Sequence, residues 1–288
     1  MWTHREAIVN GIRFHYVEAG EGPLVLLLHG FPEFWYGWRY QIPALAAAGF
    51  HVVAPDMRGY NLTEKPPGVQ SYHIGHLVAD AAELLRAFGG PEGSFLVGND
   101  WGGVISWYTA SRHPELVRKL VVLNAPHPNR YLEIVRGSLE QALKSYYVGL
   151  FQIPRLPEWL LTLRGGALVE RLIRGSGVNP ANFTREDGRR FREAIGQPGA
   201  ATATLNYYRS EARRSLRRGL EEVPVAVTVP TLLLWGRNDV ALSAANADAA
   251  ALRRWIPDLH VELFDASHWL NTDLPEAVNA RIITFLRA

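Results

Sequence analysis

Short runs of continuously apolar residues recur along the chain, and longer amphipathic stretches separate them. Residues 24–28 are apolar at every position, which is typical of a strand buried on both faces of a sheet. Similar runs follow at 51–56, 94–98, 119–124, 229–235 and 260–264, and residues 74–88 have the spacing of an amphipathic helix. Strands that alternate with helices in this way predict an α/β fold with a mostly parallel sheet and helices on both faces.

The alternation breaks once, and that break predicts the domain organisation. The strand pattern stops at Asn124 and resumes only near 229, and the residues between them look helical, with glycine and proline breaks. We therefore predict a core formed by 1–125 and 224–288, with a helical cap inserted at 126–223. Alternating residues on either side of Asn10-Gly11 predict an opening hairpin. Helices are expected at 244–255 and 275–286.

Composition narrows the class of protein without naming a function. The 288 residues are 48% hydrophobic and 20% charged, and the net charge of +2 gives no global sign of a nucleic-acid or anionic-membrane partner. There is no cysteine, so disulfide and thiolate chemistry are excluded. No apolar run is long enough to span a bilayer, and the first residues lack a signal-peptide core, so a cytoplasmic location is expected. One group of arginines is interpreted as a solvated cap face: Arg189, Arg190, Arg192, Arg213, Arg214, Arg217 and Arg218.

Asp100 occupies the most informative local pattern. The apolar run before it ends at Gly98, two glycines follow at Gly102 and Gly103, and a helix-compatible segment comes next. Strand, sharp turn and helix form a nucleophile elbow, which usually carries serine at its centre. A plain turn with Asp100 as a helix N-cap is the alternative. A nucleotide-binding loop is disfavoured, because a carboxylate at this point would repel phosphate.

Two further polar residues follow predicted strands in a suggestive order. Asp239 comes after the strand near 235, and His268 comes after the strand near 264. Sites in open α/β sheets lie beyond the carboxyl ends of the strands, and the order nucleophile, acid, histidine is that of α/β-hydrolases. We therefore predict that Asp100, Asp239 and His268 form one catalytic site.

A carboxylate nucleophile changes the expected chemistry from acyl to alkyl transfer. Its solution pKa of about 3.9 leaves it ionised at neutral pH, so it needs no activating base. His268 is then free to activate water, with Asp239 orienting its ring. Water attacking the ester on Asp100 would create an oxyanion, and the backbone N–H groups of Phe31 and Trp101 are the predicted donors.

These motifs together resemble the epoxide hydrolases of the α/β-hydrolase superfamily. The resemblance rests on His29-Gly30-Phe31-Pro32-Glu33, Gly98-Asn99-Asp100-Trp101-Gly102-Gly103, Asp239 and Ser267-His268-Trp269. It implies that two cap tyrosines hold the epoxide oxygen and protonate it, and their motifs place them at Tyr147 and Tyr208. Each has a tyrosine beside it, Tyr146 and Tyr207, so the register is left open. Asn99 stands where histidine is common in the family, and Ser267 where glycine is more usual.

The expected substrate is a small apolar epoxide, with water as the second reactant and a vicinal diol as product. Apolar pocket residues are predicted at Trp35, Phe151, Trp159 and Trp269, beside Phe31 and Trp101. No cofactor is expected. No metal is expected either, because His73 and His76 have helical spacing but no third ligand in view. No nucleic-acid partner is expected, and a homodimer is left open.

Three other functions are weighed against this prediction. A haloalkane dehalogenase shares the aspartate nucleophile, Trp101 and the histidine–acid pair, but Phe31 cannot donate a side-chain hydrogen bond to halide. A fluoroacetate dehalogenase would be expected to carry arginine at Trp101. The third reading is a non-catalytic binding protein that keeps the pocket, because a fold does not fix a function.

Overall fold

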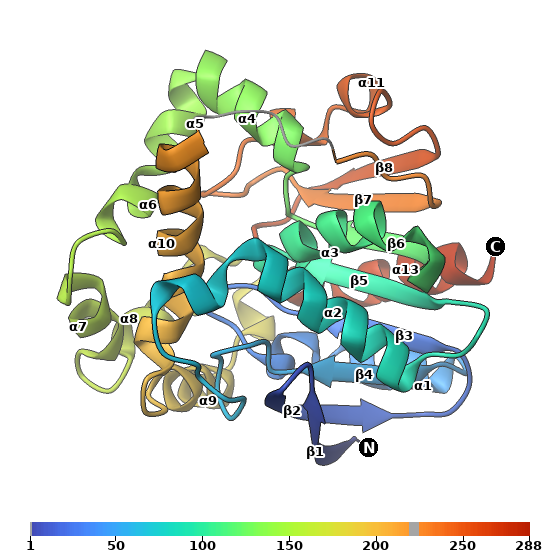
Figure 1. Cartoon of the computed structure of the whole chain (residues 1–288), viewed down its shortest axis with the longest axis horizontal. Coiled ribbons are helices and arrows are strands. Elements are labelled where there is room, and N and C mark those ends of the chain that lie inside the picture. The colour runs from blue at the N-terminus through green and yellow to red at the C-terminus, as the bar shows by residue number, and fades with distance from the viewer. Residues whose placement is uncertain (1, 219–224) are drawn as a thin grey trace.

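An eight-stranded sheet with the order β1-β2-β4-β3-β5-β6-β7-β8 forms the centre of the computed structural model, which describes residues 2–218 and 225–288 (Figure 1). The β1–β2 and β2–β4 pairs are antiparallel, and the remaining pairs are parallel. The predicted mostly parallel α/β sheet is therefore confirmed. The strands are β1 (Thr3–Val9), β2 (Ile12–Ala19), β3 (Leu24–Leu28), β4 (His51–Pro55), β5 (Ser94–Asn99), β6 (Val117–Leu123), β7 (Thr231–Gly236) and β8 (Leu259–Phe264).

Helices cover both faces of this sheet. In Figure 1, α2 and α3 lie in front of the central strands, and α1 and α13 lie behind them. Burial on both faces explains why β3 is apolar throughout and β5 is fully buried. These helices are α1 (Gln41–Ala47), α2 (Ile74–Phe88), α3 (Trp101–Arg112) and α13 (Pro275–Arg287), with the short α11 (Ala249–Leu252) and α12 (Leu270–Asp273) near the C-terminus.

Most predicted elements are confirmed, and one is wrong. The opening hairpin turns at Asn10-Gly11, and α2 has the predicted bounds. The helix predicted at 244–255 is instead a 3-10 turn (Ala244–Ala247) followed by α11. Asp248 separates the two, because its side chain accepts hydrogen bonds from the N–H groups of Ala250 and Ala251 and so starts a new helix.

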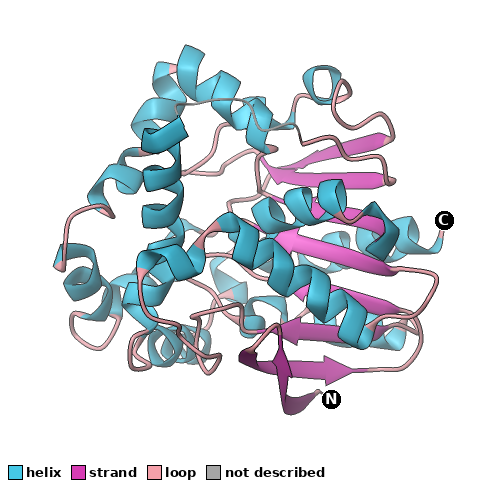
Figure 2. Cartoon of the chain, viewed as in Figure 1, coloured by secondary structure: helices cyan, strands magenta, loops and turns pink. Residues whose placement is uncertain are grey.

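Between β6 and β7 the chain leaves the sheet and forms helices. They lie beyond the carboxyl ends of the strands, where the arrowheads point in Figure 2. They are α4 (Pro128–Gly137), α5 (Leu139–Lys144), α6 (Tyr146–Leu150), α7 (Leu156–Thr162), α8 (Ala167–Ser176), α9 (Arg185–Ile195) and α10 (Ala200–Arg218). We call residues 126–223 the helical insertion; its predicted end at 223 lies outside the described residues.

Buried polar contacts fix the helical insertion to the sheet domain. Asp273, at the end of α12, accepts hydrogen bonds from the N–H groups of Val178 and Asn179 at 2.9 and 3.2 Å. The same carboxylate accepts the N–H of Ser267 at 2.7 Å. On the other side, the Tyr207 hydroxyl donates to the Arg58 carbonyl at 2.7 Å. Of the helices in residues 2–218 and 225–288, none combines the length and the hydropathy needed to cross a bilayer.

Candidate active site

Asp100 sits on a strained turn between β5 and α3. Its φ of 49° lies in the left-handed region, which a side chain other than glycine adopts only at a cost in energy. The turn also brings backbones very close together: a Cβ on Gly30 would lie 2.5 Å from Asp100 Cβ, and one on Gly102 would overlap the Leu28 carbonyl oxygen. The predicted elbow geometry is thus present, and only glycine fits at these two neighbouring positions.

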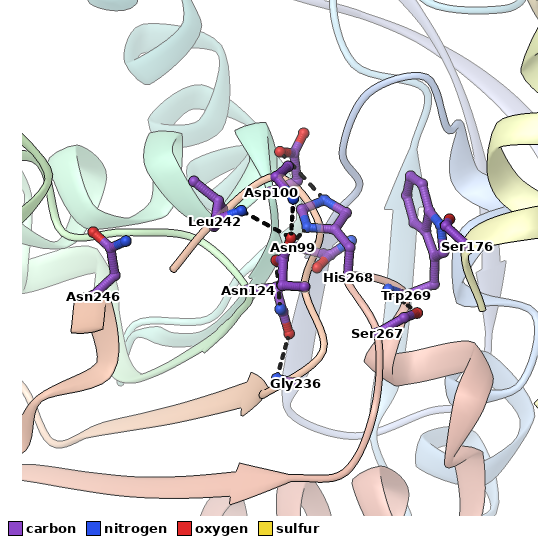
Figure 3. Close-up of polar contacts among 12 residues, drawn as sticks. Asn99, Asp100, Asn124, Ser176, Gly236, Leu242, Asn246, Ser267, His268 and Trp269 are labelled. Atoms are coloured by element: carbon purple, nitrogen blue, oxygen red, sulfur yellow. Dashed lines mark hydrogen bonds and ion pairs between the residues drawn. The ribbon is translucent and has the colours of Figure 1, made fainter. Parts of the chain in front are cut away.

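His268 lies between the two carboxylates that the sequence predicted. Its Nδ1 is 2.7 Å from Asp239 Oδ2, and its Nε2 is 3.5 Å from Asp100 Oδ2 (Figure 3). The three side chains come from the carboxyl ends of β5, β7 and β8, as expected for an open α/β sheet. The structure therefore brings the predicted nucleophile, acid and histidine into one arrangement.

Hydrogen bonds to both carboxylate oxygens hold the Asp239 side chain in place. Its Oδ1 accepts the N–H groups of Ala241 and Leu242 at 2.8 and 3.0 Å. Its Oδ2 accepts the side-chain amide of Asn124 at 2.8 Å, and Asn124 Oδ1 in turn accepts the Gly236 N–H (Figure 3). Sequence reasoning missed Asn124; its place directly after β6, the strand between β5 and β7, was the available signal.

The two aspartates control the protonation of the buried histidine. Burial alone would favour the neutral ring, but Asp239 and Asp100 outweigh burial and raise the pKa of His268 well above its ordinary value. Burial likewise opposes the charge on Asp239, but His268 and the hydrogen bonds to Asp239 lower the pKa of that carboxyl. Both neighbouring aspartates therefore favour the protonated form of His268.

The predicted oxyanion donors stand beside Asp100. The Phe31 N–H donates to Asp100 Oδ1 at 2.8 Å. Trp101 is the first residue of α3, so its N–H has no acceptor within the helix and is available at the same turn. The Phe31–Pro32 peptide bond is cis.

An aromatic cluster covers Asp100 from the side of the helical insertion. The Tyr208 ring packs edge-on against Phe31 and Trp101, with centroids 5.3 and 5.1 Å away. Tyr147 packs against Tyr208 at 5.9 Å, and Phe151 lies against both tyrosines. Four of the predicted site residues thus meet Tyr208, and the cluster joins α6 and α10 to the sheet domain.

The neighbouring tyrosines point elsewhere, which favours the register chosen from the motifs. Tyr146 is 73% exposed, whereas burial, together with Tyr131 and Asp100, raises the pKa of Tyr147 well above its ordinary value. Tyr207 uses its hydroxyl to hold Arg58, as described above. Burial and the charge of Asp100 also raise the pKa of Tyr208, so both inward-facing tyrosines carry their phenolic proton at neutral pH.

The structure places two predicted pocket residues away from Asp100. Trp35 is buried under the N-terminal hairpin, with its ring against Trp2 and His4, because the 3-10 turn that carries it packs beneath β4. Trp159 is 56% exposed on α7, because its side of the helix faces outward. Trp269 does lie at the site: its ring is 4.8 Å from that of His268, and its indole N–H donates to Ser176 Oγ (Figure 3).

Glu33 is a second feature that sequence reasoning did not single out as functional. The side chain is buried, and its carboxylate accepts hydrogen bonds from the Asn99 side-chain amide at 3.2 Å and the Gly30 N–H at 3.4 Å. Burial raises the pKa of Glu33 to about 7, although the Asn99 bond acts in the opposite direction. Its position in the same short motif as Phe31 was the signal that could have found it.

No group of three or more potential metal ligands gathers anywhere in residues 2–218 and 225–288. His73 instead serves as the N-cap of α2, and its Nδ1 accepts the Gly75 N–H. The groups that the structure brings together at the candidate site are carboxylates, an imidazole, phenols and backbone N–H groups.

Comparisons with known proteins identify the family. Residues 23–273 match the family described as alpha/beta hydrolase fold. The matched range includes most of the sheet and all three of Asp100, Asp239 and His268, so the chain belongs to this fold family. Over 282 residues the chain is 44% identical to the AB hydrolase superfamily protein YfhM of Bacillus subtilis (strain 168), covering 96% of each chain.

The more specific likeness is to epoxide hydrolases. The chain is 40% identical to human epoxide hydrolase 4, covering 96% of this chain and 76% of that protein. The Bacillus megaterium epoxide hydrolase in complex with an inhibitor is similar in structure, with a TM-score of 0.90, 32% identity and coverage of 99% and 100%. The Vigna radiata enzyme VrEH1 has a TM-score of 0.86, 31% identity and coverage of 99% and 98%. The chain belongs to the epoxide hydrolase family of the α/β-hydrolase fold.

Proposed function

We propose that the protein hydrolyses apolar epoxides to vicinal diols through a covalent ester on Asp100. The observation that carries the proposal is the aspartate at the elbow, 3.5 Å from His268 Nε2 and faced by the phenols of Tyr147 and Tyr208. Epoxide hydrolysis requires a nucleophile that attacks carbon, acids that protonate the departing oxygen, and a base that activates water. The site supplies a carboxylate, two phenols and an imidazole for these roles.

In the first step, Asp100 Oδ2 attacks one epoxide carbon and the C–O bond to that carbon breaks. The departing oxygen would become an alkoxide, so a phenolic proton from Tyr147 or Tyr208 moves onto it. The Phe31 N–H holds the other carboxylate oxygen and so directs the attacking one. The product of this step is a hydroxyalkyl ester on Asp100 and a tyrosinate, which takes a proton from the His268 imidazolium and leaves that ring neutral.

In the second step, water attacks the carbonyl carbon of the Asp100 ester while His268 takes its proton. The oxyanion is stabilised by the N–H groups of Phe31 and Trp101. Its collapse breaks the bond between the carbonyl carbon and the ester oxygen, and that oxygen takes the proton of the new Asp100 carboxyl group, which releases the diol and restores the Asp100 carboxylate. The diol therefore leaves with an oxygen that had belonged to Asp100, and the water oxygen stays on the enzyme.

Ester formation itself prepares His268 to act as the base. In the free protein the negative charge of Asp100 helps to raise the pKa of His268. Once Asp100 is an uncharged ester, that contribution disappears and burial acts against the imidazolium. His268 thus becomes easier to deprotonate at the moment when a base is needed, while Asp239 keeps its orientation.

The helical insertion is proposed to act as the cap of this site. It supplies both tyrosines and Phe151, so an epoxide must enter between it and the sheet domain. Phe31, Trp101 and Trp269 form the core side of the proposed pocket. With no cation among these side chains, the pocket suits a neutral, apolar substrate.

The test of the proposal is product formation from matched substrates. Styrene oxide and larger aryl or alkyl epoxides should yield vicinal diols, whereas chloro- and bromoalkanes of similar size should release no halide. Diol is measured by chromatography and halide by ion-selective electrode. Halide release without diol would assign the site to a dehalogenase, and binding without any turnover would assign it to a non-catalytic relative.

Removing the phenolic hydroxyls should slow ester formation. Tyr208→Phe is expected to lower the alkylation rate by roughly tenfold to a hundredfold, and the Tyr147→Phe/Tyr208→Phe pair by about 10³-fold, the usual range for a general acid. Rapid mixing with a fluorescent epoxide separates alkylation from hydrolysis. Tyr146→Phe, at the exposed neighbour, is the matched control and should change neither rate. Equal loss in both steps would contradict the assigned role.

A further inference from the structure

One short helix of the insertion, α7, carries a row of exposed large apolar side chains. Leu156, Trp159 and Leu163 recur at helical spacing on one face, and they are 38%, 56% and 39% exposed. The opposite face, with Leu161 buried, packs against α8 and α10. Figure 1 shows α7 at the outer left edge of the molecule. The catalytic chemistry proposed above uses none of these three side chains.

Two arginines flank this face at backbone positions that are costly for them. Arg155 caps the start of α7 with φ of 64°, and Arg164 follows its end with φ of 52°. Glycine or asparagine adopts this left-handed conformation more readily. Both side chains are exposed, and within the described residues neither guanidinium pairs with a carboxylate. A strained position that keeps an unpaired arginine points to a use for its charge.

The positive charge of the chain is concentrated in the sequence of the helical insertion. Residues 126–223 contain sixteen arginine and lysine residues against ten aspartate and glutamate residues, a net charge of +6. The rest of the chain has a net charge of −4, so the overall charge of +2 is the sum of two regions of opposite sign. The one carboxylate of α7, Glu158, is turned inward and paired with Arg209, at 2.6 Å. The outward face of α7 is therefore apolar and cationic.

We propose that this face of α7 docks on an anionic phospholipid surface, with Trp159 at the headgroup level and Arg155 and Arg164 against lipid phosphates. Apolar side chains with a tryptophan, bounded by basic residues, are the pattern of an interfacial helix that lies on a bilayer without crossing it. Basic residues near such a surface each add to the attraction.

A second copy of the chain fits this face less well. A two-fold contact would place Arg155 and Arg164 against the same residues of the other copy, inside an already basic region. The exposed apolar area of the three side chains is on the order of 300 Å², well below the ~800 Å² per partner of a stable interface. An anionic lipid surface attracts the two arginines instead of repelling them, and it does not need a large apolar contact area.

The contacts of Arg209 connect the docking face to the site. Arg209 follows Tyr208, donates to the carbonyls of Phe151 and Ile153, and pairs with Glu158 of α7. The docked helix is thus joined directly to the segments that carry the aromatic cluster. Docking itself does not depend on the proposed reaction, so it is tested by binding alone.

The experiment is vesicle flotation of the full chain, with phosphatidylcholine vesicles that either contain or lack phosphatidylglycerol. We expect binding to the anionic vesicles at low salt and its loss at high salt, because screening weakens the attraction. Trp159→Ser should weaken binding about tenfold. Arg155→Gln/Arg164→Gln should weaken it about 25-fold, or roughly fivefold per arginine, with an unchanged circular dichroism spectrum in each case.

Matched controls make the result specific to α7. Ile8→Ser removes a 79% exposed apolar side chain on β1, and Arg185→Gln/Arg253→Gln removes two exposed charges elsewhere; both should bind as the parent does. No flotation with anionic vesicles at low salt would overturn the proposal, and so would equal losses in the controls. A dimer in analytical ultracentrifugation that Trp159→Ser converts to monomer would overturn it in favour of a second copy.

Discussion

Asp100→Asn should abolish diol formation, lowering turnover of the best epoxide by about 10⁴-fold or more, as loss of a covalent nucleophile usually does. The amide is isosteric and can still accept the Phe31 N–H, so the fold and the elbow should survive. Steady-state diol formation and thermal unfolding, measured on the same preparation, check both parts of the expectation.

Asp100→Ala guards against slow deamidation of the asparagine, which would restore the native side chain. Isotope labelling sharpens the test: a single turnover in H₂¹⁸O with enzyme in excess should give unlabelled diol, because the transferred oxygen comes from Asp100. Labelled diol in that first turnover, or full activity in either variant, would contradict the covalent route.

His268→Gln should trap the ester rather than prevent its formation. Asp100 needs no base, so alkylation should continue, whereas hydrolysis loses its base and turnover should fall by about 10³–10⁴-fold. Mass spectrometry of a protease digest should then find the mass of one epoxide added to the peptide that contains Asp100.

The control for this adduct is the double variant Asp100→Asn/His268→Gln, which should carry no added mass. An adduct on another peptide would move the nucleophile elsewhere. A His268→Gln protein that turns over normally would show that water is activated by a different group, with buried Glu33 as the next candidate.

Features that depend on local pattern were predictable from the sequence. The apolar run of β3, the Asn10-Gly11 turn and the elbow around Asp100 each follow from residues adjacent in the chain. The shared location of Asp239 and His268 also followed, because parallel strands carry their carboxyl ends to one edge of the sheet.

Features that depend on packing were not predictable in the same way. Trp35, Trp159 and Phe151 are all large aromatic residues, and only the arrangement of the helices decides which of them joins the cluster around Tyr208. Asn124 gains its importance from a partner 115 residues away. The break at Asp248 depends on one side chain that caps a helix within a stretch of otherwise good helix formers.

The hydrogen bonds to Asp273 limit how the binding site can vary. One buried carboxylate holds both the segment after α8 and the peptide next to His268, so Val178 and Asn179 cannot shift without disturbing the proposed catalytic base. Among the described residues, the Asp273 carboxylate accepts no hydrogen bond from α6 or α10. Substitutions in α6 and α10 can therefore change substrate preference, whereas the segment after α8 is constrained by its link to the histidine loop.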